Sequence, residues 1–557
     1  MYFILYNKGK IHFFYERKRI MIEFEHKLPA LSIGEGNGTY NNYESGFPGI
    51  FTTKNPRLGL FLHQLRNVVA DDRRLVFVDG KILSCQNNWI RDCVHEMKGF
   101  KHWEYNIGSF LNFIIETQRE DGQFFELIKQ YDDYHWKFVH EESRVIYEED
   151  NVALVRLELE ADVEYLVVEG ATNYYKVFGD NAWLSKVLPK LEKSIEYMTS
   201  DKDRWDAEHG LVKRPFTIDT WDFKYGYSGE DRRIDPDTPM SIMHGDNSGV
   251  YQAMLQLAWM NRKLEREEKA LYWEEKAQKL RENMFRYLWN GSFFIHQLHL
   301  GHPGADDLES VRLSLSNSYD MNRGVTDLEQ SRSIIAEYIR RKDTTEFFAE
   351  WFSIDPPYEN FNGYSKGSYV NGAISPFTAG ELAKAAFCNG YEEYAWGILT
   401  RFMELVERDG TTYFLYDTDS KPQPQGGPSA WGSAALISAI DEGLAGIVDA
   451  DVCYRTIDFS PRFVVTDYTE LRYTTGYEVT NTMVDVRFII KDNGMRYDII
   501  SPAETVRAHI LLPKGKQCTK LLVNGQEQPF ESVMVAESNY VDVTVSADKK
   551  VSFEIIF

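Results

Sequence analysis

Hydrophobic residues recur at helical spacing through the central part of the chain, from about residue 85 to residue 449. The periodicity predicts helices over residues 107–118, 162–178, 183–198, 248–263, 265–288, 326–340, 376–388, 391–407 and 431–443. Several helices are paired across a short turn, as at Phe178-Gly179-Asp180 and Asn389-Gly390-Tyr391. Helix pairs at this rhythm predict a toroid of α-hairpins, although the sequence contains no strict repeat.

The pattern of polar and apolar residues is different at the two ends of the chain. Residues 1–84 combine glycine-rich loops with short strand-like runs such as residues 75–78 before the turn Asp79-Gly80, which predicts a lead-in segment. From residue 450 to 557 polar and apolar residues alternate, and turn signals such as Asn524-Gly525 separate the runs. We therefore expect a mostly α catalytic domain over residues 85–449, followed by an antiparallel β-sandwich over residues 450–557.

The overall composition excludes several classes of protein. A formal net charge of -23, with 85 acidic residues, argues against a nucleic-acid partner, because a phosphate backbone attracts Lys and Arg. The five cysteines are scattered without CxxC spacing, so neither a disulfide framework nor a zinc site is expected. Aromatic residues make up 14% of the chain, and aromatic faces stack on the apolar sides of sugar rings. The composition thus favours a carbohydrate ligand.

The chain has no predicted membrane span or export signal. No apolar run reaches the roughly 18 residues that cross a bilayer. The short apolar opening is followed, rather than preceded, by basic residues, which is the wrong order for a signal peptide. We expect a cytoplasmic protein whose start is either Met1 or Met21, and the sequence leaves its oligomeric state open.

A carboxyl group flanked by aromatic residues is the first candidate for chemistry. Trp221-Asp222-Phe223 lies in a long polar loop, residues 205–240, and loops of this length in a compact domain are usually functional. Partial desolvation beside Trp221 would raise the pKa of Asp222 toward that of a useful proton donor. The alternative is that Asp222 caps a turn.

Further candidates for binding a sugar lie before and after this loop. In Trp89-Ile90-Arg91-Asp92, a guanidinium beside a carboxylate offers donors and acceptors to a vicinal diol, although the same pair also suits a structural salt bridge. Trp89, Trp103 or Trp221 would supply an apolar platform. Later motifs are Tyr369-Val370-Asn371-Gly372 and Gly427-Pro428-Ser429-Ala430-Trp431.

These motifs and their order along the chain resemble the six-hairpin glycosidases, namely trehalases of family 37, processing α-glucosidases of family 63 and glucoamylases of family 15. The resemblance implies an (α/α)6 barrel in which Asp222 is the general acid, while Thr220 stands where the family has glycine. It also implies that Arg91 and Asp92 hold the innermost sugar. Tyr369, Asn371 and Trp431 are then candidates to face the pocket.

The general base is the missing part of this pattern. Families 15 and 63 carry a Glu about where Phe414 to Tyr416 stand, and this sequence has none there. Inversion requires two carboxyl groups about 6.5–9.5 Å apart with a water between them. Asp417, Glu359, another residue or none remain open as the base.

The resemblance implies an inverting, exo-acting glycoside hydrolase on a neutral oligosaccharide, with an α-glucoside as the expected substrate. This chemistry needs neither a metal nor a cofactor. One alternative is an α-L-rhamnosidase-like hydrolase, which shares the barrel and sandwich but whose usual acidic motif is not evident. The other is a catalytically silent glycan-binding protein that kept the cleft and lost the base.

Overall fold

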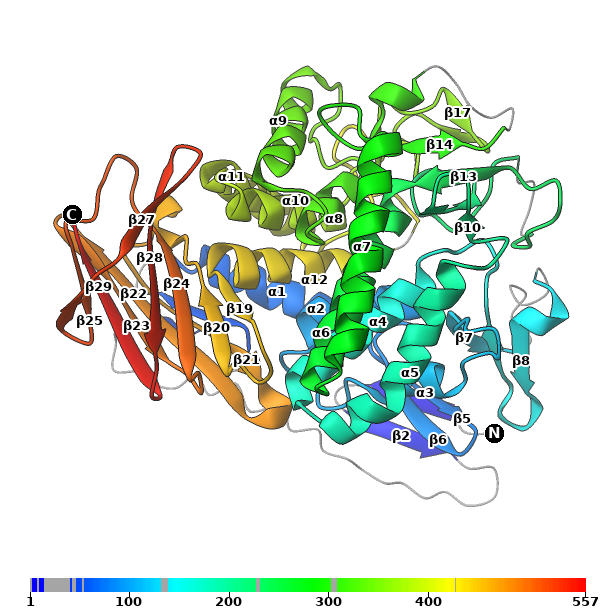
Figure 1. Ribbon diagram of the computed structural model, residues 1–557, viewed down its shortest axis with the longest axis horizontal. Coiled ribbons are helices and arrows are strands. Elements are labelled where there is room, and N and C mark those ends of the chain that lie inside the picture. The colour runs from blue at the N-terminus through cyan, green and yellow to red at the C-terminus, as the bar shows by residue number, and fades with distance from the viewer. Residues whose placement is uncertain are drawn as a thin grey trace.

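The computed structural model describes residues 3–7, 10–14, 41–42, 47–52, 55–131, 139–226, 231–301, 308–425 and 427–557. Both candidate starts, Met1 and Met21, lie outside these residues. Within them the chain folds into a helical body and a β-sandwich that lie side by side (Figure 1).

Six helices of the described chain contact one another in a closed ring. Each touches the next in the order given, and the last touches the first: α2 (Ile90–Phe100), α4 (Val163–Phe178), α6 (His244–Lys263), α8 (Ser316–Asn322), α10 (Pro376–Cys388) and α12 (Ala430–Ser438). These inner helices are buried nearly all round. In α12, for example, every residue except Trp431 is buried, as expected of a helix enclosed by its neighbours.

A second set of helices packs on the outside of this ring. Each contacts at least one inner helix: α1 (Arg57–Asp71), α3 (Ser109–Glu116), α5 (Asn181–Met198), α7 (Glu267–Leu288), α9 (Leu328–Thr344) and α11 (Glu392–Asp409). An outer helix buries one stripe only. In α7 this stripe includes Ala270, Trp273 and Ala277, while most of the exposed side chains of the helix are charged or polar.

Local sequence signals fix where these helices begin and end. Asp180 accepts hydrogen bonds from the backbone of Ala182 and Trp183 at the start of α5. A capping box of Asp327 and Gln330 begins α9. Gly179, at a φ of 63°, ends α4 in the left-handed conformation that glycine adopts without strain.

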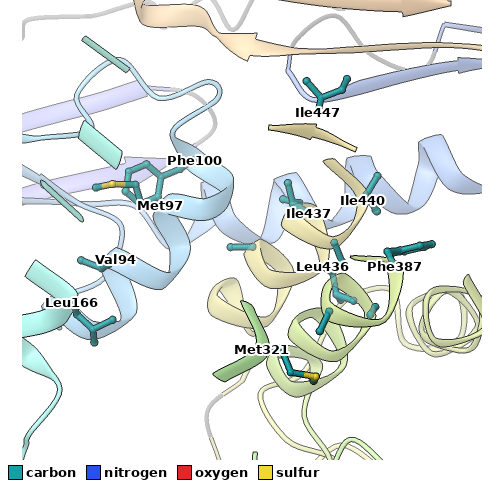
Figure 2. Packing of buried hydrophobic residues seen from close by; sticks show 14 of the residues in the cluster. Val94, Met97, Phe100, Leu166, Met321, Phe387, Leu436, Ile437, Ile440 and Ile447 are labelled. Carbon is teal, nitrogen blue, oxygen red and sulfur yellow. The ribbon is translucent and has the colours of Figure 1, made fainter. Parts of the chain in front are cut away.

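Apolar side chains of the inner helices belong to one buried cluster. Figure 2 shows part of this packing, with Val94 and Met97 of α2, Leu166 of α4, and Leu436 and Ile437 of α12 among the residues labelled. All five are fully buried. The inner helices are therefore held together by a continuous apolar core.

Short strands connect the helices near one end of the ring. They pair as β5 (Arg74–Val78) with β6 (Lys81–Cys85); β7 (Leu127–Gln130) with β9 (Val152–Val155) and β8 (Arg144–Tyr147); β10 (Trp205–Asp206) with β11 (Leu211–Val212); β12 (Arg214–Pro215) with β13 (Met240–Met243) and β14 (Gln297–His299); β15 (Leu313–Ser314) with β16 (Ile354–Asp355); and β17 (Asn360–Phe361) with β18 (Tyr364–Ser365). A further hairpin joins β1 (Phe3–Asn7) and β2 (Lys10–Phe14). The turn Asp79-Gly80 lies between β5 and β6, where the sequence pattern places it.

Two sheets face each other in the C-terminal sandwich. One has the strand order β19 (Ile447–Asp449), β20 (Thr456–Phe459), β24 (Thr505–Leu511), β28 (Ser538–Ser546) and β27 (Glu531–Val535). The other has the order β26 (Gln526–Gln528), β25 (Lys520–Val523), β29 (Lys550–Ile556), β23 (Gly494–Ile500), β22 (Thr482–Lys491), β21 (Glu470–Tyr477), β4 (Gly49–Thr52) and β3 (Asn41–Asn42). Phe459 of the first sheet contacts Tyr497 and Phe553 of the second, so aromatic rings fill the space between the sheets.

Two details of the sandwich differ from the sequence prediction. The sheets are antiparallel except for β20 and β24, which pair in parallel because the intervening chain passes through the other sheet. In addition, β4 of the lead-in segment pairs with β21, and α1 packs on α12 and α2. Residues before 85 therefore contribute two strands, β3 and β4, to the sandwich and an outer helix to the ring.

Candidate active site

A pocket of about 220 Å³ lies where the inner helices begin. Trp89 directly precedes α2, Leu315 precedes α8, and Phe377 and Trp431 lie in the first turns of α10 and α12. The pocket is lined by Asn87, Trp89, Arg91, Asp92, Thr220, Trp221, Asp222, Leu315, Tyr369, Phe377, Phe414 and Trp431. Seven of the residues predicted from the sequence are among them: Trp89, Arg91, Asp92, Trp221, Asp222, Tyr369 and Trp431.

Buried hydrogen bonds hold the loop that carries Asp222. Arg214 of β12 donates to the carbonyl oxygen of Trp221 at 2.6 Å. The carboxylate of Asp219 accepts from the hydroxyl of Ser316 at 2.5 Å and from its backbone N–H at 3.2 Å. These contacts tie the loop to β12 and to the start of α8, so Asp222 has a fixed support on two sides.

A histidine completes this support. The backbone N–H of Asp219 donates to Nε2 of His296 at 2.9 Å, so the ring carries its proton on Nδ1, which lies 2.8 Å from the carboxylate of Glu309. Burial lowers the pKa of His296 despite the nearby Glu309, which keeps the ring neutral in this role. Burial alone would raise the pKa of Asp219, but His244 and hydroxyl groups of Ser314 and Ser316 outweigh it and hold the pKa below its usual value.

Aromatic rings form the walls on either side of Asp222. The Trp221 ring lies 5.2 Å from Tyr369 and meets the Phe414 ring edge-on at 5.7 Å. Across the pocket, Trp431 stacks on Phe377 with ring centres 4.8 Å apart, and its indole N–H donates to the hydroxyl of Tyr319 at 3.1 Å. Trp431 also stacks on His95 with ring centres 4.3 Å apart, so ring packing holds this wall of the pocket.

The guanidinium of Arg91 is held in place by two buried acidic residues. Its guanidinium donates to the two carboxylate oxygens of Asp162 at 2.6 and 2.9 Å, and it also contacts Glu160. Burial alone would raise the pKa of Asp162, but Arg91 outweighs it and lowers the pKa. The positive charge of Arg91 is therefore balanced within the protein, in the manner of the salt bridge that the sequence left open as an alternative.

Asp92 is the second acidic side chain at the pocket. Burial raises the pKa of its carboxyl group to about 7 against the opposing charge of Arg91, and the negative charges of Asp72 and Asp222 act in the same direction as burial. The protein therefore brings two carboxyl groups of the described chain, those of Asp92 and Asp222, to one aromatic pocket.

Four predicted residues lie elsewhere. Trp103 follows α2 at the opposite end of the ring, where Arg66 covers its face at 5.3 Å. Asn371 is fully buried and exchanges hydrogen bonds of 2.9 Å with the backbone of Tyr358, so it supports the loop and does not reach the pocket.

The two residues proposed as general base are also outside the pocket lining. The carboxylate of Asp417 accepts from the backbone N–H groups of Asp419 and Lys421, both at 2.9 Å, and thereby closes its own turn. The side chain of Glu359 is 89% exposed and pairs with Lys366. Neither Asp417, which is close in sequence to the vacant position, nor Glu359, which lies in another loop, is among the residues that line the pocket.

Five lining residues were not predicted from the sequence: Asn87, Thr220, Leu315, Phe377 and Phe414. Phe414, which lies in the segment where the sequence comparison expected a catalytic Glu, places an aromatic ring in the pocket wall. Phe377 lies in the first turn of the predicted helix 376–388, where the inner helices converge on the pocket, whereas Leu315 precedes α8, which the sequence pattern does not predict.

Neither a metal centre nor a membrane span is found in the described ranges. No group of three or more His, Cys, Asp or Glu side chains there is arranged to hold a metal ion. None of the helices in the described part of the chain is both long and apolar enough to cross a membrane.

Comparison with known proteins finds its matches among solved structures. No protein-family model and no curated protein sequence matches this chain. The α-L-rhamnosidase from Dictyoglumus thermophilum superposes with a TM-score of 0.58 at 12% identity, covering 92% of this chain and 51% of that chain. The GH78 rhamnosidase of Bacillus sp. GL1 gives 0.57 at 14% identity, covering 84% and 43%. The Streptomyces avermitilis α-L-rhamnosidase, solved with L-rhamnose, gives 0.55 at 13% identity, covering 92% and 42%.

All three of these structures are glycoside hydrolases. The predicted likeness in fold to barrel glycoside hydrolases is confirmed by these three superpositions. This chain spans only about half the length of the rhamnosidases it matches, with 51%, 43% and 42% of their chains covered. At such low identity the likeness concerns the fold alone, and activity has to be argued from the pocket.

Proposed function

We propose that this protein is an inverting, exo-acting glycoside hydrolase that removes a neutral terminal sugar from an oligosaccharide or glycoside, with an α-glucoside as the main candidate. The observation that carries the proposal is the composition of the pocket. Asp222 lines it together with aromatic side chains that include Trp221, and the loop that carries Asp222 is held by hydrogen bonds of Arg214 and Asp219. The closed ring of helices around it is the arrangement expected of an (α/α)6 barrel.

The size of the pocket supports exo action. Its volume of about 220 Å³ is below the roughly 300–1,000 Å³ of pockets that enclose drug-sized ligands. Such a space suits one sugar ring, while the remainder of the substrate stays outside. The Trp221 ring, which makes only tilted and edge-on contacts with its neighbours, would pack against the C–H surface of that sugar ring.

The charges around the pocket support a neutral substrate. Arg91 is paired with Asp162 and contacts Glu160, so its charge is already balanced. Asp92 and Asp222 add acidic groups at the surface of the pocket. A uronate would meet this surface with a like charge, which disfavours an acidic sugar and therefore a lyase acting on one.

In the proposed reaction Asp222 acts as the general acid. It protonates the glycosidic oxygen as the bond to the anomeric carbon breaks, and a water attacks that carbon from the opposite face. The carbon passes through an oxocarbenium-like state, which the acidic surroundings of the pocket favour electrostatically.

An α-L-rhamnosidase-like activity is the second candidate. The three rhamnosidases named above share the fold, and Leu315, Phe377 and Phe414 give the pocket an apolar side. An apolar side suits the methyl group that a 6-deoxy sugar carries in place of a hydroxymethyl group.

The test is hydrolysis of 4-nitrophenyl α-D-glucopyranoside and 4-nitrophenyl α-L-rhamnopyranoside. We expect release of 4-nitrophenol from one of them, and NMR of the freshly released sugar should show the inverted anomer first. Release of the retained anomer would contradict inversion. Sugar binding by calorimetry without turnover of any glycoside would identify a silent glycan-binding protein instead.

Replacing Asp222 by Asn should lower kcat on the cleaved glycoside by about 10²–10⁴, the usual contribution of a general acid. Asp237→Asn is a matched control, since Asp237 is an exposed carboxylate on the same loop. We expect that variant to keep wild-type kcat in the same 4-nitrophenol assay. Equal activity of the two variants would remove Asp222 from the mechanism.

A further inference from the structure

An inverting glycosidase needs a second carboxylate to activate water, and the pocket offers one. Among the described residues that line it, only Asp92 and Asp222 carry a carboxyl group. Asp417 closes a turn and Glu359 points to solvent, so the base has to be sought within the pocket. Phe414 occupies the wall near the position at which the related families place a Glu.

We propose that Asp92 is the general base, which takes a proton from the water that attacks the anomeric carbon while Asp222 protonates the leaving oxygen. This inference rests on the proposed function and deepens it by assigning the second catalytic residue. It differs from the role that the family resemblance implies for Asp92, which is to hold sugar hydroxyls.

The position of Asp92 is rigid, as a catalytic base requires. It lies in the first turn of α2, next to Arg91, whose guanidinium is held in two hydrogen bonds by Asp162. Trp89, directly before the helix, forms part of the same pocket wall. The start of α2 therefore presents one aromatic face and one carboxyl group to the pocket from a fixed backbone.

The charges facing Asp92 make it a stronger base than an ordinary carboxylate. Burial has the largest effect, Arg91 opposes it, and Asp72 and Asp222 reinforce it, which together place the pKa of Asp92 at about 7. A base with a pKa near the working pH combines a substantial ionised fraction with a strong tendency to take up a proton.

The step balances within the pocket. The bond between water oxygen and the anomeric carbon forms as the glycosidic C–O bond breaks. One proton of the water passes to Asp92, and the proton of Asp222 passes to the leaving oxygen. After the products leave, exchange of protons with solvent returns Asp92 to the carboxylate and Asp222 to the acid.

The first test compares two substitutions of Asp92 on the aryl glycoside that the wild type cleaves. Asp92→Asn should lower kcat by about 10²–10⁴ with a much smaller change in KM. Asp92→Gly leaves room for a small anion, and sodium azide should restore turnover, with a glycosyl azide of inverted configuration as the product. Thermal unfolding monitored by circular dichroism checks that both variants are folded.

The second test is the pH dependence of kcat/KM. Below a pH of about 7 the Asp92 carboxyl is protonated and cannot accept a proton, so the wild-type rate should fall as the pH decreases through about 7. Asp72→Asn is the matched control, because Asp72 raises the pKa of Asp92 from outside the pocket lining. That variant should keep the plateau rate and move the acidic limb to lower pH.

Each alternative outcome is distinct. A residue that only holds sugar hydroxyls would raise KM on substitution, and azide would not rescue its removal. Loss of activity in Asp417→Asn or Glu359→Gln, with activity retained in Asp92→Asn, would overturn the assignment while leaving the proposed function intact. Absence of glycoside hydrolysis in the wild type would instead contradict the proposed function itself.

Discussion

Glu126 is a buried carboxyl group beneath the pocket, and its surroundings determine how stability responds to pH. It lies 3.9 Å from Arg156, and the backbone N–H of Leu157 donates to it at 3.2 Å. Burial raises its pKa from 4.5 to about 8, against the charges of Arg91 and Arg156. The folded state therefore binds the proton more tightly than the unfolded state does.

The consequence is a stability contribution with a defined sign. It is fully present below pH 4.5 and is lost as the pH rises to about 8. Between these values the free energy of unfolding should fall by about 1.4 kcal/mol per pH unit for this one group. Glu126→Gln removes the titrating group and keeps an oxygen for the Leu157 N–H.

The measurement is urea unfolding of the wild type and of Glu126→Gln at several pH values. As the pH rises from 4.5 to 8, the free energy of unfolding of the wild type should decrease relative to that of Glu126→Gln, because only the wild type has the titrating group. A difference that stays constant over this range would show that Glu126 does not titrate in the folded protein between these limits.

At the residue scale, local sequence was a good guide where the chemistry is local. Trp221 and Asp222 are adjacent in sequence and reach the pocket together. It was a poor guide where distant segments must meet. Asp417 follows Phe414 by three residues, yet Phe414 lines the pocket while Asp417 turns back to bind its own backbone. Only the path of the loop decides between these outcomes.

At the scale of elements, glycines set how closely the inner helices approach. A Cβ atom on Gly380 of α10 would lie 2.5 Å from the carbonyl carbon of Ala435 in α12. Backbone atoms cannot move aside as a flexible side chain can. The two helices therefore pack at a distance that only glycine permits at this position.

Gly380→Ala should lower the free energy of unfolding by about 1–3 kcal/mol, the usual effect of overpacking. Gly397→Ala in α11 is the control, because a Cβ there would meet nothing within 4 Å. Gly397→Ala should raise the free energy of unfolding by about 0.5–1 kcal/mol, since alanine has a higher helix propensity than glycine. Chemical denaturation of both variants tests the pair, and equal effects of the two changes would contradict the packing argument.

Several of the longer helices in the central part of the chain were predicted well. The predicted segment 376–388 coincides with α10, and 391–407 differs from α11 by one or two residues at its ends. The inner helix α8 was not predicted, because its seven residues are too few to show a period and six of them are buried. The inner helix α10 is longer than α8, so its spacing of apolar residues was visible although most of them are buried.

At the scale of the whole molecule, the helical body and the sandwich share contacts that bind them together. Tyr473 of β21 donates to Asp441, which follows α12, at 2.9 Å, and Lys176 of α4 donates to the carbonyl of Asp449 at 2.8 Å. Gly49 of β4 accepts from Thr474, 425 residues along the chain. No local pattern in the sequence predicts that two residues so far apart along the chain will pair.

These contacts predict one cooperative unfolding transition. Ile50 of β4 is buried, with 5% of its surface exposed, and Ile50→Ala should cost about 2–5 kcal/mol. All twelve Trp residues precede residue 432, so Trp fluorescence reports on the helical body alone. The substitution should nevertheless move the fluorescence transition as far as the circular dichroism transition.

The control for this prediction is Ile82→Ala, since Ile82 of β6 is 51% exposed and its loss should change the free energy of unfolding by less than about 0.5 kcal/mol. A fluorescence midpoint that stays in place in Ile50→Ala, while the circular dichroism signal shifts, would show that the sandwich unfolds independently of the ring.

The ring of inner helices has two unlike ends. The pocket lies where these helices begin, whereas the sandwich contacts His102, Lys176 and Asp441 near the points where α2, α4 and α12 finish. Variation in the connecting loops at the first end can therefore alter which ligand the pocket accepts without disturbing the contacts with the sandwich at the second end. Changes that affect ligand specificity and changes that affect the stability of the contact with the sandwich are therefore expected at opposite ends of the ring.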